Sequence, residues 1–210
     1  CSHTVVIEGP PIAGFVYNSP VLLGNPVVLT NTTWAYPAVT DWSWKFGDGD
    51  FSNDPTPPPH VYANAPVYTV TLTARNIKGS HTYTDTVIVQ VPSVYGVTLI
   101  PPTAAQSGNP GSLVTYTLRL TNTGNTVDTF TLSKGNTAWT TDVPASAGLL
   151  AAGTGTNVQV VVHIPPGASG GATDAAIVAV RSQGDATKSA TSTLTTAARW
   201  TYVYLPLVRK

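Results

Sequence analysis

The feature that most constrains the fold of this 210-residue sequence is an alternation of apolar and polar side chains along short segments. In residues 67–74, threonines take every second position after Tyr68, and the positions between them carry Val70, Leu72 and Ala74. A period of two places Tyr68 and these three on one face of an extended chain, as in an antiparallel strand with one buried face. No segment shows the apolar spacing of an amphipathic helix. The sequence therefore predicts an all-β fold.

The same alternation returns in the second half of the chain, in residues 114–121 and 158–164. Pro92 interrupts the pattern between the halves, and the sequence Leu-Thr-Asn-Thr occurs once in each half, at residues 29–32 and 120–123. One β-sandwich needs roughly 100 residues, so this length accommodates two. We expect an extended N-terminal segment at 1–11, sandwiches at 12–92 and 96–198, and a C-terminal strand or tail at 199–210.

Charge is scarce in this chain, because only 10% of its residues are charged and the formal net charge is zero. Such a composition offers no basic patch for nucleic acid or for an anionic membrane. No apolar run approaches the roughly 18 residues of a transmembrane segment. The sequence also lacks Met, from which we expect a processed or excised chain. These features predict an exported protein, extracellular or at the cell surface, with no nucleic-acid partner.

Three sequence blocks follow one another in the first half: Trp-Lys-Phe-Gly-Asp-Gly at 44–49, His-Val-Tyr at 60–62 and Tyr-Thr-Val-Thr-Leu at 68–72. This order resembles the PKD domain family over about residues 10–91, which implies an immunoglobulin-like sandwich. The two aromatic residues of the first block share one strand face and suit a core, and its Gly-Asp-Gly reverses the chain. We interpret the motif residues as structural: Trp44, Phe46, Gly47, Asp48, Gly49, His60, Tyr62 and Tyr68.

The second half resembles bacterial immunoglobulin-like domains in its Tyr-Thr-Leu-Arg-Leu-Thr-Asn-Thr-Gly segment, residues 116–124. That resemblance implies a spacer, stalk or binding module. The C-terminal Tyr-Leu-Pro-Leu-Val-Arg resembles the endings of secreted proteins from Chloroflexota-type bacteria and implies export. The predicted fold class is therefore all-β, with two tandem immunoglobulin-like β-sandwiches and strand-like terminal segments.

Chemical motifs are weak throughout the sequence. Residues 167–171 match Gly-x-Ser-x-Gly, but a nucleophile elbow needs a strand before the serine and a helix after it, and prolines precede this loop. Asp48, Asp50, Asn53 and Asp54 could collect oxygens around Ca²⁺, yet they lack the spacing and terminal Glu of an EF-hand, which favours a solvated turn. We therefore predict no catalytic residue, no metal site and no cofactor, and expect that the protein is not an enzyme.

Two further features leave alternatives open. Cys1 is the only cysteine, and it is either a lipid-anchored residue of a surface lipoprotein or an incidental chain boundary. Several aromatic residues could either stack on a cell-surface polysaccharide or belong to the sandwich cores: Trp34, Tyr36, Trp42 and Trp139.

The two chain ends carry strand-like apolar runs. An extended terminal strand can complete the open sheet edge of another copy, and a head-to-tail contact of this kind generates a filament. The first hypothesis is therefore a self-associating surface filament. The alternatives are an accessory or stalk module of a secreted hydrolase or adhesin, and a carbohydrate-binding surface protein. The candidate assembly residues are Val5, Ile7, Trp200, Tyr202, Tyr204, Leu205 and Leu207.

Overall fold

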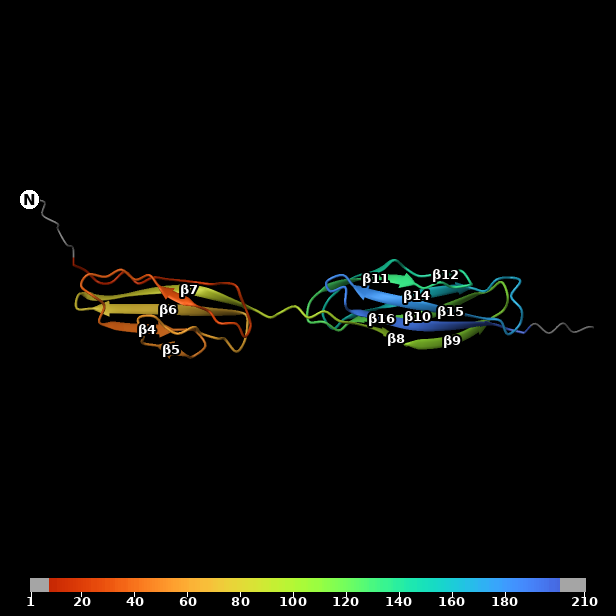
Figure 1. The fold of residues 1–210 in the computed structure, drawn as a ribbon, viewed down its shortest axis with the longest axis horizontal. Coiled ribbons are helices and arrows are strands. Elements are labelled where there is room, and N and C mark those ends of the chain that lie inside the picture. Colours follow the sequence, from red (N-terminus) through yellow and green to blue (C-terminus); the bar gives the residue numbers. More distant parts are fainter. Residues whose placement is uncertain (1–7, 201–210) are drawn as a thin grey trace, which may run out of the picture. The chain divides into compact units, whose positions relative to one another are not determined.

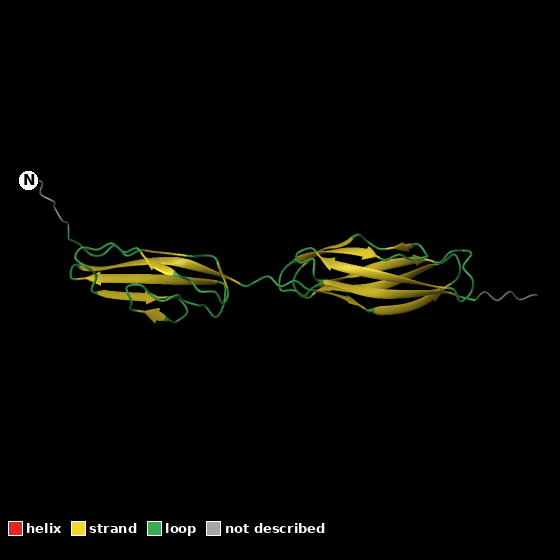
Figure 2. Cartoon of the chain, viewed as in Figure 1, coloured by secondary structure: helices red, strands yellow, loops and turns green. Residues whose placement is uncertain are grey.

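A computed structural model describes residues 8–200 and shows an all-β protein, with 16 strands and no helix in that range (Figures 1 and 2). The predicted fold class is confirmed. The same residues contain no helix that could cross a bilayer. The chain divides between Pro92 and Ser93 into two compact units, here called the first unit and the second unit, which are described separately.

The first unit is a sandwich of two sheets with the strand orders β1-β3 and β2-β7-β6-β4-β5. All its strand pairs are antiparallel except β2 with β7. Isolated bridges from Ile12 to Trp34 and from Val27 to His60 extend the smaller sheet. The strands are β1 (Phe15–Tyr17), β2 (Val21–Leu22), β3 (Leu29–Asn31), β4 (Asp41–Lys45), β5 (Phe51–Ser52), β6 (Val67–Asn76) and β7 (Gly79–Gln90).

The core of the first unit is largely aromatic. Trp44 on β4 pairs in register with Leu72 on β6, and both are fully buried. The Trp44 ring lies 5.3 Å from that of Phe15 on β1, so it joins the two sheets. On β6 the predicted alternation holds, since Val70 and Ala74 are buried while the threonines between them face outward.

The second unit is also a sandwich, with the strand orders β12-β14-β10-β8 and β13-β11-β15-β16-β9. Only β9 with β16 is a parallel pair. Its strands are β8 (Val97–Ile100), β9 (Thr103–Gly108), β10 (Leu113–Asn122), β11 (Asp128–Lys134), β12 (Thr141–Asp142), β13 (Ser146–Leu150), β14 (Gly155–His163), β15 (Thr173–Ser182) and β16 (Ser189–Ala198).

The core of the second unit is mostly aliphatic and is supplied by long strands. β10 and β14 pair continuously from Leu113–His163 to Thr121–Gly155, and their inward positions carry fully buried side chains such as Leu118 and Val160. Tyr116 is buried among them and donates its hydroxyl to the Thr195 carbonyl at 2.7 Å. The predicted alternation in residues 114–121 and 158–164 thus lines this core.

Candidate functional site

The Gly-Asp-Gly segment forms a tight turn between β4 and β5. Phe46 N–H donates to the Asp50 carbonyl at 3.1 Å and closes the turn. Gly47 has a φ of 92°, and a Cβ added there would lie 2.6 Å from the Thr69 carbonyl oxygen, so a side chain at this position would be both strained and obstructed. The sequence therefore shapes this turn through glycine, as the motif predicts.

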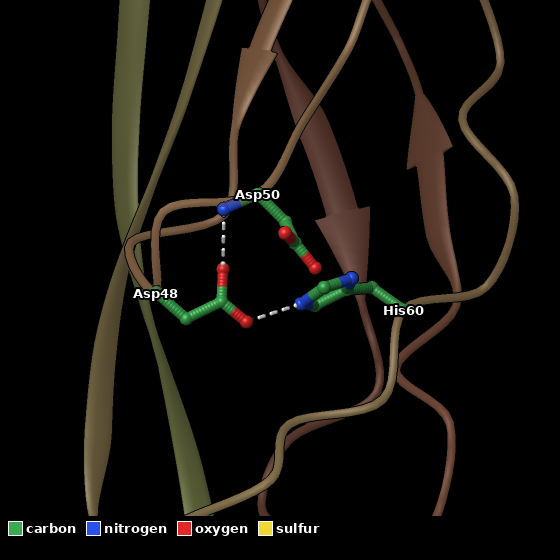
Figure 3. Close-up of side chains that lie close together, drawn as sticks. All are labelled: Asp48, Asp50 and His60. Atoms are coloured by element: carbon green, nitrogen blue, oxygen red, sulfur yellow. Dashed lines mark hydrogen bonds and ion pairs between the residues drawn. The ribbon is translucent and has the colours of Figure 1, made fainter.

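Three side chains converge beside this turn: Asp48, Asp50 and His60 (Figure 3). The Asp48 carboxylate accepts the Asp50 backbone N–H at 3.1 Å, and its other oxygen lies 2.6 Å from His60 Nε2. One ligand atom from each of the three residues lies within 4.8 Å of the others. Two carboxylates and one imidazole, separated by up to twelve positions in the sequence, thus form one cluster.

His60 is held in place from several directions. Its backbone exchanges hydrogen bonds with Val27 at 2.7 and 2.9 Å, and its ring stacks on Phe46 with centroids 4.3 Å apart. The Tyr62 ring also meets it in a T-shaped contact, with centroids 4.6 Å apart. The imidazole is therefore fixed by the fold, and its Nε2 is directed at Asp48.

Electrostatics in this cluster follow from these contacts. Burial by itself raises the pKa of Asp48, but hydrogen bonds from His60 and from the Asp50 backbone outweigh it and hold the pKa below its ordinary value. Burial, followed by the negative charge of Asp48, raises the pKa of Tyr62. The Tyr62 phenol therefore stays protonated and donates to the Phe46 carbonyl at 2.8 Å.

The surface beside the cluster is hollowed. An open depression of about 440 Å³ is lined by Asp50 and His60 together with Asn53 and Asp54. The Asp54 carboxylate accepts a hydrogen bond from Ser52 Oγ at 3.2 Å, so it is already engaged in the loop. Sequence reasoning grouped Asp48 and Asp50 with Asn53 and Asp54, and it missed His60 as the partner of Asp48.

The structure places most of the PKD-motif residues in the core or against it. Trp44, Phe46 and Tyr62 are buried, and the Tyr68 ring stacks on Tyr62 with centroids 4.0 Å apart. Trp44 Nε1–H donates to the Asp54 carbonyl at 3.0 Å, which ties the loop after β5 to the core. These side chains therefore contribute to the core of the first unit and to the anchoring of its loops.

Two other groups of chemically capable residues among residues 8–200 lie in the second unit. Residues 167–171 lie in the loop between β14 and β15, with a strand rather than a helix after them. In the second unit His163 Nε2 lies 2.6 Å from an oxygen of Asp142, and both side chains are exposed. This pair has no third metal-binding group beside it among residues 8–200.

The candidate assembly residues fall almost entirely outside the described part of the chain. Trp200 is described: its side chain is exposed and lies against the loop of its own unit, where a Cβ added at Gly170 would come 2.6 Å from its ring. The other candidates, together with the possible lipidation residue, lie outside residues 8–200: Cys1, Val5, Ile7, Tyr202, Tyr204, Leu205 and Leu207.

The four aromatic residues considered for sugar stacking separate into two groups. Trp34 and Tyr36 are 59% and 47% exposed, whereas Trp139 is buried in the core of the second unit and Trp42 is partly buried. Trp34 bridges to Ile12, which is also exposed. We give the name outer β1/β3 face to the large exposed hydrophobic residues on β1 and on the segments that flank β1 and β3: Ile12, Val16, Val28, Trp34 and Tyr36.

The fold assigns the chain to the all-β proteins built of tandem sandwiches. Residues 9–91 match the PKD domain family, and this part of the chain therefore belongs to it. The second unit's resemblance to bacterial immunoglobulin-like domains stays a prediction, as does the Chloroflexota-type character of the C-terminal ending.

Two solved structures of PKD domains are similar to this chain. The PKD1 domain of Vibrio anguillarum Epp is 31% identical, with coverage of 41% of this chain and 100% of that chain and a TM-score of 0.36. The PKD1 domain from the Vibrio cholerae metalloprotease PrtV is 32% identical, with coverage of 38% of this chain and 96% of that chain and a TM-score of 0.34. No curated protein matches the chain.

Proposed function

We propose that the chain is a non-catalytic structural module of an extracellular protein, serving as a spacer or accessory segment. The observation that carries this proposal is the short connection between two self-contained cores. Leu23 N–H still bonds the Gln90 carbonyl in the first unit, and Val94 N–H already bonds Asn125 Oδ1 in the second. Only residues 91–93 lie between these anchors, so the segment that connects the two cores is short.

Further support comes from the kind of protein in which the family occurs. One PKD relative is a domain of the Vibrio cholerae metalloprotease PrtV, which is consistent with a PKD domain accompanying another part of a longer chain. The scarcity of charge and the threonine-rich strand faces suit a surface exposed outside the cell.

Protease shaving of intact producing cells tests the location. An extracellular module is removed by added protease without lysis, whereas a cytoplasmic protein stays intact until the cells are broken.

Insertion of Gly-Ser-Gly-Ser after Ser93 tests the spacer role. NMR relaxation should then show the two units tumbling more independently than in the parent chain. Equal tumbling before and after insertion would contradict a spacer of defined length.

Self-association is the finer form of this proposal, and an exposed sheet edge favours it. β9 is an end strand of its sheet, and its sequence Thr-Ala-Ala-Gln-Ser-Gly contains no charged side chain. Natural edge strands are commonly protected by charge or proline, so an uncharged edge is available to a strand from another copy. The donor in this hypothesis is a chain end, outside residues 8–200.

Electron microscopy tests the filament directly. The intact chain should form fibres, and deletion of residues 201–210 or of residues 4–8 should abolish them according to which end donates. Ala105→Lys on β9 should also prevent assembly. Ile177→Lys, at an exposed position of the inner strand β15, is the matched control and should not. Monomers at all concentrations for the intact chain would eliminate this finer form.

A neutral polysaccharide is a second candidate, favoured by the outer β1/β3 face. Trp34 lies at an isolated bridge and Tyr36 lies in the bend two positions later, and both side chains are exposed. Sugar rings stack on exposed aromatic side chains. Pull-down with insoluble cellulose and a soluble neutral glucan tests this function. Trp34→Ala should abolish binding, and Trp200→Ala, which removes an exposed Trp of the second unit, should leave it unchanged. An equal loss of polysaccharide binding in both variants would indicate non-specific adsorption and would contradict this function.

A further inference from the structure

The Asp50 carboxylate has no role in building the turn that carries it. The turn is closed by backbone groups of Asp50: its carbonyl accepts from Phe46 N–H, and its N–H donates to Asp48. Its carboxylate makes no hydrogen bond or ion pair with residues 8–200. It nevertheless approaches both Asp48 and His60, with one ligand atom of each residue within 4.8 Å of the others.

We propose that Asp48, Asp50 and His60 form a binding site for a divalent transition metal, with Zn²⁺ the expected ion. Two carboxylate oxygens and one imidazole nitrogen are a mixed donor set. Zn²⁺ accepts such a set in a four-coordinate site and takes a water as its remaining ligand. Ca²⁺ takes six to eight oxygens and Mg²⁺ prefers oxygen and retained water, so the nitrogen of His60 selects against both.

The donor geometry is close to what a four-coordinate ion requires. Zn–N and Zn–O bonds of about 2.0–2.1 Å place neighbouring donor atoms roughly 3.3 Å apart. The Asp48 oxygen and His60 Nε2 are 2.6 Å apart, and the three donors span up to 4.8 Å. A small opening of the first pair and a rotation of the exposed Asp50 side chain bring all three to one ion. The metal then replaces the proton shared by Asp48 and His60.

The fold holds these donors before any ion arrives. Glycines on both sides of Asp48 set its turn, and His60 is held by backbone pairing with Val27 and by stacking on Phe46. A preorganised set of ligands binds more tightly than one that must be ordered on binding. The open depression beside Asp50 and His60 gives an approaching hydrated ion access and leaves room for the fourth ligand.

The second unit supplies an internal comparison. Its Asp142–His163 pair has the same 2.6 Å separation between oxygen and nitrogen, but no second carboxylate accompanies it among the residues described. Two ligands of this kind form a much weaker site than three. We therefore expect one tight site in each chain, located in the first unit.

Calorimetric titration of the full chain with ZnCl₂ tests the proposal. All proteins carry Cys1→Ser and His3→Ala, because the thiol and imidazole near the terminus would bind Zn²⁺ independently. The parent should bind one equivalent. Asp50→Asn replaces a direct ligand, so it should weaken binding by at least about tenfold, the smallest loss expected when even an outer-shell partner of a metal site is mutated. Asp54→Asn in the same depression and Asp142→Asn in the second unit are the matched controls and should bind like the parent.

A second readout separates a built site from a loose acidic surface. Co²⁺ substituted for Zn²⁺ should give the visible absorption of a four- or five-coordinate nitrogen and oxygen site, and Asp50→Asn should lose it while retaining the parent's circular dichroism. Parent-like affinity in Asp50→Asn would overturn the proposal. It would also be overturned by equal weakening in Asp50→Asn and Asp54→Asn, by no saturable binding, or by equally effective competition from Ca²⁺.

Discussion

Both units are β-sandwiches, but they differ in strand length and in the side chains that fill their cores. In the first unit the smaller sheet has strands of only three residues, and aromatic rings fill the space between the sheets. In the second unit long strands supply aliphatic side chains, and β10 and β14 stay in register from Leu113 to Thr121. Among residues 8–200, every ring–ring contact falls in the first unit.

The two units therefore differ in which contacts stabilise them. The β1-β3 sheet provides few ladder hydrogen bonds, in contrast to the ten paired positions of β6 and β7, so a small number of large side chains hold this short sheet against the longer one. The second unit spreads burial over many similar methyl-bearing residues. A single change should therefore damage the first unit more than a comparable change damages the second.

The largest effect is expected at Trp44. Trp44→Ala leaves a large cavity and removes the donor to the Asp54 carbonyl, so the first unit should lose about 3–5 kcal/mol of unfolding free energy. Leu118→Ala is the counterpart in the second unit and should cost about 2–5 kcal/mol there. Hydrogen exchange with mass spectrometry, read separately for each unit, measures both changes. Loss of protection in both units from either variant would contradict independent cores.

A smaller contrast is expected between the two asparagines of the repeated Leu-Thr-Asn-Thr sequence. Asn122 is fully buried, donates to the carbonyls of Thr126 and Leu150, and accepts the Gly124 N–H. Asn122→Ala should therefore cost about 1–3 kcal/mol, because buried backbone groups lose their partners. Urea unfolding monitored for the second unit measures this loss.

Asn31 makes the matching contacts in the first unit, donating to the Pro55 carbonyl and accepting the Thr33 N–H, but it is partly exposed. Water can replace its partners, so Asn31→Ala should cost only about 0.5–1.5 kcal/mol. A cost equal to that of Asn122→Ala would show that burial does not set the difference between the repeats.

Alkaline pH should affect the first unit through Tyr17. Burial, followed by the nearby Asp85, raises the pKa of Tyr17 above its ordinary value of about 10. The folded state therefore holds this proton more tightly than the unfolded state. The resulting stability is complete below pH 10 and is lost as the pH rises through the folded-state pKa. Tyr17→Phe should flatten this alkaline decline in a pH series of thermal melts, and an unchanged slope would refute the assignment.

The smallest effect is expected at Asp185 in the second unit. Hydrogen bonds from the Thr187 hydroxyl and backbone N–H lower the pKa of this exposed carboxyl. The stability it contributes is present above the ordinary Asp pKa of about 3.9 and is lost as the pH falls through the lower folded-state value. Asp185→Asn should remove this slight acid dependence, which melts of the second unit between pH 2 and pH 5 can detect.

Much of the fold could be predicted because strand alternation is a local property. Tyr68 to Ala74 show in the sequence which side chains face inward, and the structure follows that pattern. The shared asparagine positions also indicated two modules of related plan. The sequence did not predict that each unit's first two strands join different sheets, as β8 and β9 do, because strand partners are chosen by the whole sandwich.

The candidate site was only half predictable. Gly47 and Gly49 predict a turn, and an aspartate between them is expected to accept hydrogen bonds from nearby backbone N–H groups. The partnership of Asp48 with His60 could not be read from this pattern, since a proline-rich loop separates them and its path depends on packing. The family spacing of the Gly-Asp-Gly and His-x-Tyr blocks was the available signal, and it carried no indication of contact.

By itself, the sequence determined that this protein is all-β, that its strands have one wet face, and that the Gly-Asp-Gly segment turns. These properties follow from neighbouring residues, because side-chain alternation and glycine's backbone freedom act over a few positions. Tertiary structure alone decided that Trp34 is exposed while Trp139 is buried, and that an imidazole meets two carboxylates at one turn. Such meetings depend on how distant segments pack, and no local pattern encodes that.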